Sequence, residues 1–316
     1  MKVALVLFGY AALLAAVGPM VLRRAGWVDR APRLGVLMWL VLVASIVASV
    51  VLAGFSLAVP IGTVSGDLAA LLRACVMALR AQYATSGGAA VGVVGAVLSL
   101  LVIARLVYCA AAAAAESAAL RRDQLRVMAI VGHRDPRWDA VIVDHDVAAA
   151  YCLPGRRQRV VVSSEALRTL ADDEIDAVLA HERAHLRGRH HLLVGAVTAV
   201  ARAFWFVPVF GVARHEVSRL VELLADDAAT RTCSRLAMAD ALLGVAAVPA
   251  PTGALGAGGT STALRVRRLI EPHVPLSRGR RLVGTLAVGV LLAVPVLVAT
   301  GPAIVATQLN YCPVPL

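Results

Sequence analysis

The stretch "VLAHERAHLRGRHH", Val178–His191, gathers four histidines and one glutamate within fourteen residues of a chain otherwise rich in alanine, valine and leucine. Two interpretations compete: a metal site on a helix, or a polar run where a helix leaves a membrane. The stretch contains the pattern H-E-x-x-H. Residues four apart share one face of a helix, so His181 and His185 can bind one metal ion. Glu182 lies beside that face, where a carboxylate can exchange a proton with water.

The residues around this motif have helical periodicity. Ile175, Val178, Leu179, Glu182 and Leu186 recur at spacings of three and four residues from Asp172 onward. This spacing indicates an amphipathic helix with one apolar face.

A third metal ligand must come from elsewhere, because catalytic zinc takes three protein ligands and keeps one position open. His190 and His191 lie roughly 13–15 Å from His181 along a continuous helix, too far to share its ion. We expect them to cap a helix, pack in the fold or face lipid headgroups.

The segment "VELLADDAAT" offers Glu222 with Asp226 one turn later. That spacing suits a ligand and a carboxylate that orients an imidazole, so we predict these roles for Glu222 and Asp226. Other candidates downstream are His215, Glu216 and Asp227.

The composition is that of a membrane protein. The chain has 316 residues, 59% of them hydrophobic, against about 45–50% in soluble domains. The formal charge is +11, and Lys2 is the only lysine. The arginines cluster beside apolar segments, which is typical of cytoplasmic loops in membrane proteins. We therefore expect a lipid bilayer as partner and no direct nucleic-acid binding.

Four apolar segments reach the ~20 residues needed to cross a bilayer; they are 3–22, 34–59, 89–115 and 282–306. The basic segments 23–33 and 265–281 place the N-terminus outside. The prediction is three transmembrane helices in 1–115, a cytoplasmic zinc metallopeptidase domain in 116–281, and a last transmembrane helix with a short outer tail in 282–316. Cys75 and Cys312 then lie on the outer side, either paired or as independent thiols.

Residues 192–213 are apolar enough for a fifth crossing. A single crossing would put the two halves of the metal site on opposite sides of the membrane. We therefore predict a membrane-associated or re-entrant helix or bent hairpin that returns to the same side.

The cytoplasmic region also contains strand patterns. "DAVIVDHD" (139–146) and "RVVVSS" (159–164) are β-branched runs bounded by polar residues, and "AAAYCLPG" (148–155) between them ends in a turn signal. An edge strand such as 158–163 could bind an extended substrate by main-chain hydrogen bonds.

The segments "AAAYCLPG", "RVVVSSEALRTLADDEIDAVLAHERAHLRGRHHL" and "VELLADDAA" together resemble the BlaR/MecR membrane zinc metallopeptidases. These are antirepressors of a signal-transducer family related to HtpX and the CAAX prenyl proteases, and the similarity is close over about residues 135–275. The resemblance implies an α-helical membrane protein with an inserted cytoplasmic α+β gluzincin-like metallopeptidase domain. It implies Zn²⁺ on His181, His185 and Glu222, with Glu182 as general base and Asp226 in support.

The resemblance further implies a multi-pass protein of the bacterial inner membrane whose active site faces the cytoplasm, with a BlaI-type transcriptional repressor as partner. The sensor-transducers carry an extracellular penicillin-binding domain after the last span, and this sequence shows no S-x-x-K acylation motif. We therefore expect that sensor domain to be lacking.

Three functions follow, of which the first is preferred. It is a zinc endopeptidase that acts on a BlaI-type repressor. The second is an HtpX-like quality-control protease for membrane proteins. The third is a non-enzymatic membrane scaffold whose arginine-rich inner surface binds anionic lipid or a regulator.

Overall fold

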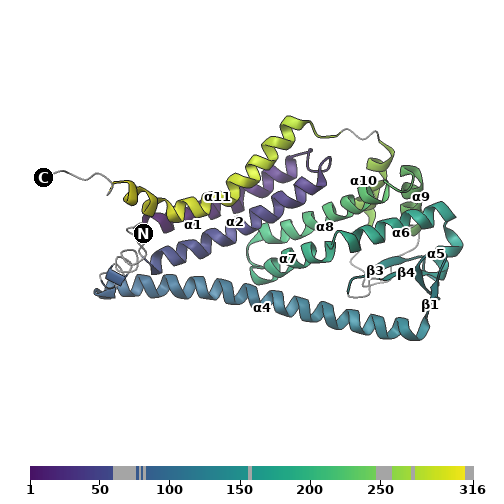
Figure 1. Cartoon of the computed structure of the whole chain (residues 1–316), viewed down its shortest axis with the longest axis horizontal. Helices are drawn as coiled ribbons and strands as arrows, with labels where there is room; N and C mark the ends of the chain where they lie inside the picture. Colours follow the sequence, from purple (N-terminus) through teal and green to yellow (C-terminus); the bar gives the residue numbers. More distant parts are fainter. Residues whose placement is uncertain are drawn as a thin grey trace.

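The computed structural model shows a long bundle of apolar helices that leads into a small region of helices and strands (Figure 1). It describes residues 1–59, 76–77, 80, 83–155, 159–246, 258–271 and 275–309. Four of its helices are long and apolar enough to cross a membrane; these spans are Lys2–Arg24, Pro32–Ala58, Ser86–Met128 and Arg278–Gly301. They agree with the four segments that hydropathy predicts.

Helix α2 (Pro32–Ala58) is the centre of the bundle. It packs against α1 (Lys2–Arg24), α4 (Ser86–Val131) and α11 (Arg278–Leu309). Small residues allow α2 and α4 to approach closely, as is usual between membrane helices. A Cβ atom on Gly54 would lie 2.7 Å from the carbonyl oxygen of Gly95. The Ser99 hydroxyl donates a hydrogen bond of 2.9 Å to the Val51 carbonyl across the same contact.

Helix α4 is much longer than a membrane crossing. It contains 46 residues, which corresponds to about 69 Å at 1.5 Å per residue. Figure 1 shows it running along one side of the molecule from the far end of the bundle to the sheet. The domain boundary predicted after residue 115 therefore lies inside one continuous helix.

Residues 192–213 belong to a helical hairpin. Its arms are α7 (His190–Ala203) and α8 (Pro208–Ala229), which pack against each other. Helix α7 also packs against α4, and α8 packs against α2. Trp205 and Phe206 at the turn are 76% and 62% exposed. The chain thus doubles back between the two halves of the predicted metal site, while the depth of the hairpin in a bilayer stays a prediction.

A four-stranded sheet follows α4; its strands are β1 (Gly132–Asp135), β2 (Ala140–Val143), β3 (Ala150–Leu153) and β4 (Arg159–Ser163). Their order is β1-β2-β4-β3, with β2 and β4 parallel and the other pairs antiparallel. Both predicted strands are present, as β2 and β4.

The segment 148–155 contains β3 ahead of its turn signal. One strand prediction was wrong. The segment 158–163 was expected to form an edge strand, but β4 lies inside the sheet because β2 and β3 pair with its two sides. Strand β3 is the edge strand on this side of the sheet.

Short helices complete the described fold; they are α5 (Ser164–Thr169), α6 (Asp172–Arg187), α9 (Arg235–Ala246) and α10 (Gly258–Ile270). Helix α6 lies against β3 and β4 on one side and α8 on another. Cys75 and Cys312, the two thiols predicted on the outer side, lie outside the described residues.

The Gly54 contact predicts a stability effect. Gly54→Ala should lower the free energy of unfolding by about 1–3 kcal/mol, because the added methyl group meets the backbone of Gly95. Thermal unfolding in detergent measures this change. Gly9→Ala is the matched control, since a Cβ there meets no atom within 4 Å. Equal melting temperatures for both variants would contradict the close packing of α2 on α4.

Candidate metal centre

Helix α6 divides its side chains between two neighbours. Ile175, Leu179 and Leu186 belong to the apolar core shared with β2 and β4. His181 and His185 lie on another face and meet Glu222 of α8. The apolar face therefore anchors α6 to the sheet and directs both imidazoles toward the second helix.

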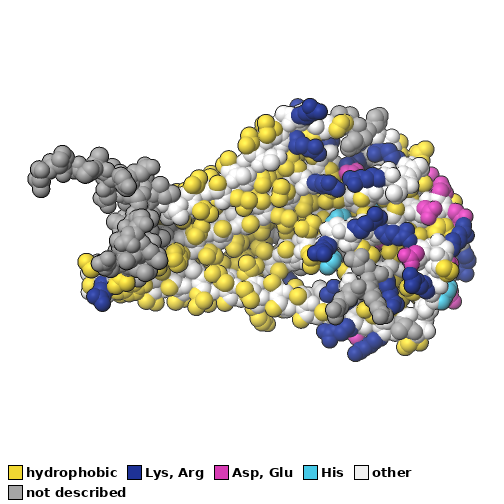
Figure 2. Space-filling model, viewed as in Figure 1, with side chains coloured by type: hydrophobic (Ala, Val, Ile, Leu, Met, Phe, Trp, Pro, Cys, Tyr) yellow, Lys and Arg dark blue, Asp and Glu magenta, His cyan; other side chains and the backbone are white. Residues whose placement is uncertain are grey.

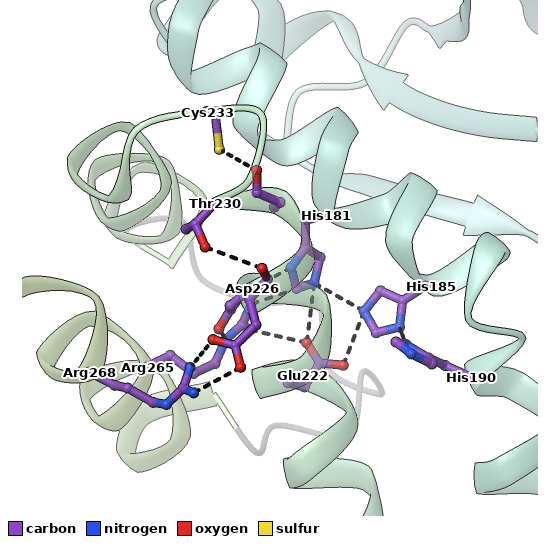
Figure 3. Close-up of polar contacts among 11 residues, drawn as sticks. His181, His185, His190, Glu222, Asp226, Thr230, Cys233, Arg265 and Arg268 are labelled. Carbon is purple, nitrogen blue, oxygen red and sulfur yellow. Dashed lines mark hydrogen bonds and ion pairs between the residues drawn. The ribbon is translucent and has the colours of Figure 1, made fainter. Parts of the chain in front are cut away.

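The two imidazoles and the carboxylate of Glu222 converge (Figure 3). The Nε2 atoms of His181 and His185 are 3.0 Å apart. Oxygen atoms of Glu222 lie 3.4 Å from His181 Nε2 and 3.5 Å from His185 Nε2. In a tetrahedral site with zinc bonds of ~2.0–2.2 Å, ligand atoms are about 3.3–3.6 Å apart. The donor set and its spacing therefore fit zinc, and the three residues form a group that could hold a metal ion.

The surroundings of the three candidate ligands shift their pKa values in different directions. Burial opposes protonation of His181, but the carboxylates of Asp226 and Glu222 outweigh burial and raise its pKa to about 9. Burial lowers the pKa of His185 to about 4. Burial also opposes ionisation of Glu222, yet its hydrogen bond and attraction to His181 bring its pKa down to about 2. The metal-free site thus holds a proton on His181 and a negative charge on Glu222 at neutral pH.

Asp226 lies behind His181, as the sequence predicted. Its Oδ1 atom is 3.0 Å from His181 Nδ1, within ion-pair distance, although the geometry falls short of a hydrogen bond. The carboxylate is 1% exposed. A buried carboxylate on Nδ1 favours the tautomer whose Nε2 lone pair is free for a metal ion.

Arg265 is a site residue that the sequence reasoning missed. It comes from α10, and its guanidinium binds both oxygens of Asp226 at 2.7 and 2.8 Å. It also lies 3.1 Å from Glu222. One turn later, Arg268 binds Asp227 in the same bidentate way, at 2.6 and 2.9 Å. The sequence signal was available, because an R-x-x-R pair on one helix matches the adjacent carboxylates of α8.

His190 lies close to the metal group, because the chain does not continue as the single helix that the sequence reasoning assumed. Helix α6 ends at Arg187, and Arg189 adopts a left-handed backbone with φ of 49°. The chain therefore turns before α7, and His190 Nδ1 comes to lie 3.0 Å from His185 Nδ1. A Cβ at Gly188 would meet the His190 ring, so a larger residue there would displace that ring.

The His185–His190 contact determines which nitrogen can bind metal. If His185 Nδ1–H donates to His190, then His185 Nε2 keeps its lone pair toward His181 and Glu222. His190 can accept because burial lowers its pKa and keeps it neutral. His190 therefore orients a candidate ligand without joining the metal group.

Glu182 lies between the metal group and the edge strand β3. Burial raises its pKa, and the positive charge of His181 opposes that rise. Cys152 of β3 is its neighbour; burial first, and then the Glu182 carboxylate, raise the pKa of this thiol to about 12. Burial thus favours the protonated form of the Glu182 carboxyl more than water does.

A cavity of about 310 Å³ opens beside the metal group. Its lining includes Cys152 and Pro154 from the β3 side, together with His185, His191 and Glu222. The other downstream candidates lie elsewhere: His215 is exposed, Glu216 pairs with Arg219, and Asp227 pairs with Arg268. Of those candidates, only Glu222 joins the two imidazoles of H-E-x-x-H.

Comparison with known proteins agrees with this arrangement. The sequence profile of peptidase family M48 matches residues 114–305, more than half of the chain. The chain belongs to peptidase family M48. No curated protein and no solved structure is significantly similar to it.

Family M48 covers HtpX, CAAX-protease and BlaR-type membrane metallopeptidases, which typically use zinc, so membership supports the resemblance at family level. It also makes the chain a member of a protease family with a candidate His-His-Glu metal group. The matched region begins inside α4 and includes α6, α8, α10 and most of α11.

The raised pKa of His181 predicts proton release on metal binding. A metal ligand must be a neutral imidazole, whereas His181 stays protonated below pH of about 9 in the metal-free protein. Binding of one zinc ion at pH 7 should release about one proton from this group. His185 and Glu222 should release none, since their pKa values lie near 4 and 2. Calorimetry in buffers of different ionisation enthalpy gives the number of protons released per zinc ion bound. A value near zero at pH 7 would contradict a protonated His181 in the metal-free protein.

The role of His190 predicts a loss of zinc affinity. His190→Phe removes the acceptor for His185 Nδ1–H, so zinc affinity should fall about 10–100-fold. Competition with a metal chelator measures it. His215→Phe is the control, because His215 is an exposed histidine on α8 outside the metal group. Unchanged zinc affinity in His190→Phe would show that the contact between His185 and His190 contributes packing alone.

Proposed function

We propose that this protein is a membrane-embedded, zinc-dependent endopeptidase. The observation that carries the proposal is the convergence of His181, His185 and Glu222, whose ligand atoms all lie within 4.8 Å of one another. Helix α6 supplies the two histidines and α8, the second arm of the hairpin, supplies Glu222, so their convergence is a property of the fold. Membership of family M48 supports the same conclusion.

In this proposal His181, His185 and Glu222 hold the zinc ion, and Glu182 is the general base. Bound zinc would supply a Lewis acid that polarises the scissile carbonyl. Glu182 takes the proton of the attacking water and passes it to the leaving amine. Its raised pKa suits the first step, because a carboxylate whose pKa lies above the usual range accepts a proton more readily.

The substrate is proposed to bind along β3. This strand pairs with β4 on one side only within the described chain, and it packs against α6. An extended peptide could therefore add to its free side through main-chain hydrogen bonds. Cys152 lies in β3 and Pro154 directly follows it. Both line the cavity that includes His185 and Glu222, so this cavity lies beside the strand.

We further propose that the active site faces the cytoplasm of a bacterial inner membrane. Figure 2 supports this, because arginines gather around the end of the molecule that carries the sheet, whereas the bundle surface is apolar. Positively charged segments are retained on the cytoplasmic side. The proposed substrate is then a cytoplasmic BlaI-type repressor, which rests on the sequence resemblance to BlaR/MecR proteins.

Glu182→Gln tests the chemistry. Peptide or casein cleavage by the full-length protein should fall at least about 100-fold, because the amide cannot accept the proton. Zinc content should remain as in the wild type, since Glu182 is not part of the metal group.

Glu174→Gln is a suitable control on the same helix. Glu174 accepts a hydrogen bond of 2.9 Å from the Ala171 amide, and a glutamine oxygen can still accept it. Undiminished cleavage by Glu182→Gln would rule out the proposed mechanism. Absence of stoichiometric zinc, with wild-type behaviour after His181→Ala, would instead favour the non-enzymatic scaffold.

A second measurement addresses the substrate. If a BlaI-type repressor is cleaved, its level should stay high in a strain that carries Glu182→Gln and fall on induction in the wild type. Accumulation of misfolded membrane proteins in the variant strain, with unchanged repressor, would favour the HtpX-like alternative.

A further inference from the structure

A second site lies away from the metal group, where α2 and α11 begin and α8 ends. Here the chain encloses a cavity of about 560 Å³. Five arginines line it. Arg235 donates hydrogen bonds to the carbonyl oxygens of Leu269 and Arg268, and the other four, Arg30, Arg33, Arg231 and Arg281, have exposed side chains. They come from three separate parts of the sequence, so the fold has brought like charges together.

No carboxylate neutralises these four arginines among the described residues. All four side chains are exposed, and none forms an ion pair there. The one acidic residue in the lining is Asp227, which already binds Arg268 through two hydrogen bonds of 2.6 and 2.9 Å. A cluster of unpaired guanidinium groups repels itself, and a multiply charged anion with oxygen acceptors relieves that repulsion.

The floor of the cavity is apolar. Leu34, Leu37 and Leu224 line it beside the arginines. A second cavity of about 590 Å³ shares Arg33, Leu37, Leu224 and Arg231 with the first. It continues along α2 past Leu40. Leu37 lines both cavities, and its side chain is 42% exposed.

The two cavities together have the polarity of an amphiphile. Arginines gather in the first, and apolar side chains predominate in the second, whose lining also includes Arg187 and His190. Their position fits the same ligand. Helices α2 and α11 are candidate membrane spans, so their first turns lie at the level where a bilayer places its headgroups. A free phosphate would use the arginines alone and leave the apolar groove without a role.

We propose that this surface binds one anionic phospholipid. The arginines hold its phosphate, and an acyl chain lies along α2 past Leu37 and Leu40. The proposal uses none of the three residues of the metal group, and the four arginines that it tests lie apart from them; His190, which contacts His185, lines only the second cavity.

The test is native mass spectrometry of the full-length protein in detergent with added phosphatidylglycerol or phosphatidylcholine. The wild type should retain one phosphatidylglycerol in preference to phosphatidylcholine. Arg33→Gln/Arg231→Gln should weaken retention by about fivefold or more for each arginine. Arg30→Gln/Arg281→Gln, which changes the other pair, should weaken it similarly. These side chains are exposed, so the fold should tolerate both changes.

Arg122→Gln/Arg214→Gln is the matched control for loss of charge. Both residues are exposed and unpaired with acids in the described chain, neither lines the cavities, and Arg214 shares α8 with Arg231. This control should retain phosphatidylglycerol within twofold of the wild type.

Three results would overturn the proposal. The wild type could retain phosphatidylcholine as well as phosphatidylglycerol, or the cavity variants could lose no more phosphatidylglycerol than the control variant does. Soluble glycerol phosphate could also displace phosphatidylglycerol at comparable concentration. The last result would assign the arginines to a free phosphate compound.

Discussion

The convergence of two imidazoles from α6 and one carboxylate from α8 is the constraint on which the rest of the fold depends. The three donors must lie within the reach of one ion, yet an apolar segment long enough to cross a membrane separates them. A chain can satisfy both conditions only by turning back. The α7–α8 hairpin does so, and its packing on α2 and α4 ties the candidate metal centre to the membrane bundle.

The surroundings of the metal group are held by matched charges. Each adjacent carboxylate of α8 has its own arginine on α10: Asp226 has Arg265, and Asp227 has Arg268. Without Arg265, Asp226 would be a buried carboxylate beside a second one at Glu222, and both would tend to protonate. The arginine keeps Asp226 ionised, since it lowers that pKa to about 2 against the opposing effect of burial. Asp226 can then act on His181.

Sequence reasoning recovered the parts of this protein that depend on local periodicity. The four apolar spans, the helix with H-E-x-x-H, and Glu222 and Asp226 one turn apart all follow from spacing along one element. Sequence reasoning failed where a break in a helix, or a residue from a distant part of the chain, decides which side chains meet. His190 was placed on a continuous helix, whereas the left-handed residue Arg189 redirects the chain. Arg265 was counted only as part of a basic segment, because its partner lies 39 residues away. The position of β4 inside the sheet was also missed. Strand order decides which strand lies at an edge, and a run of β-branched residues does not specify that order.

Helix α4 has a mechanical consequence. It contains no proline in its 46 residues, and a straight helix of that length is stiff. Its last turn leads directly into β1, so the sheet is mounted on the end of a rod whose other end belongs to the bundle. If the bundle spans a bilayer, the length of α4 sets the distance between that bilayer and the sheet. For the proposed peptidase, a substrate anchored in the same bilayer would then reach β3 only with segments that extend over that distance.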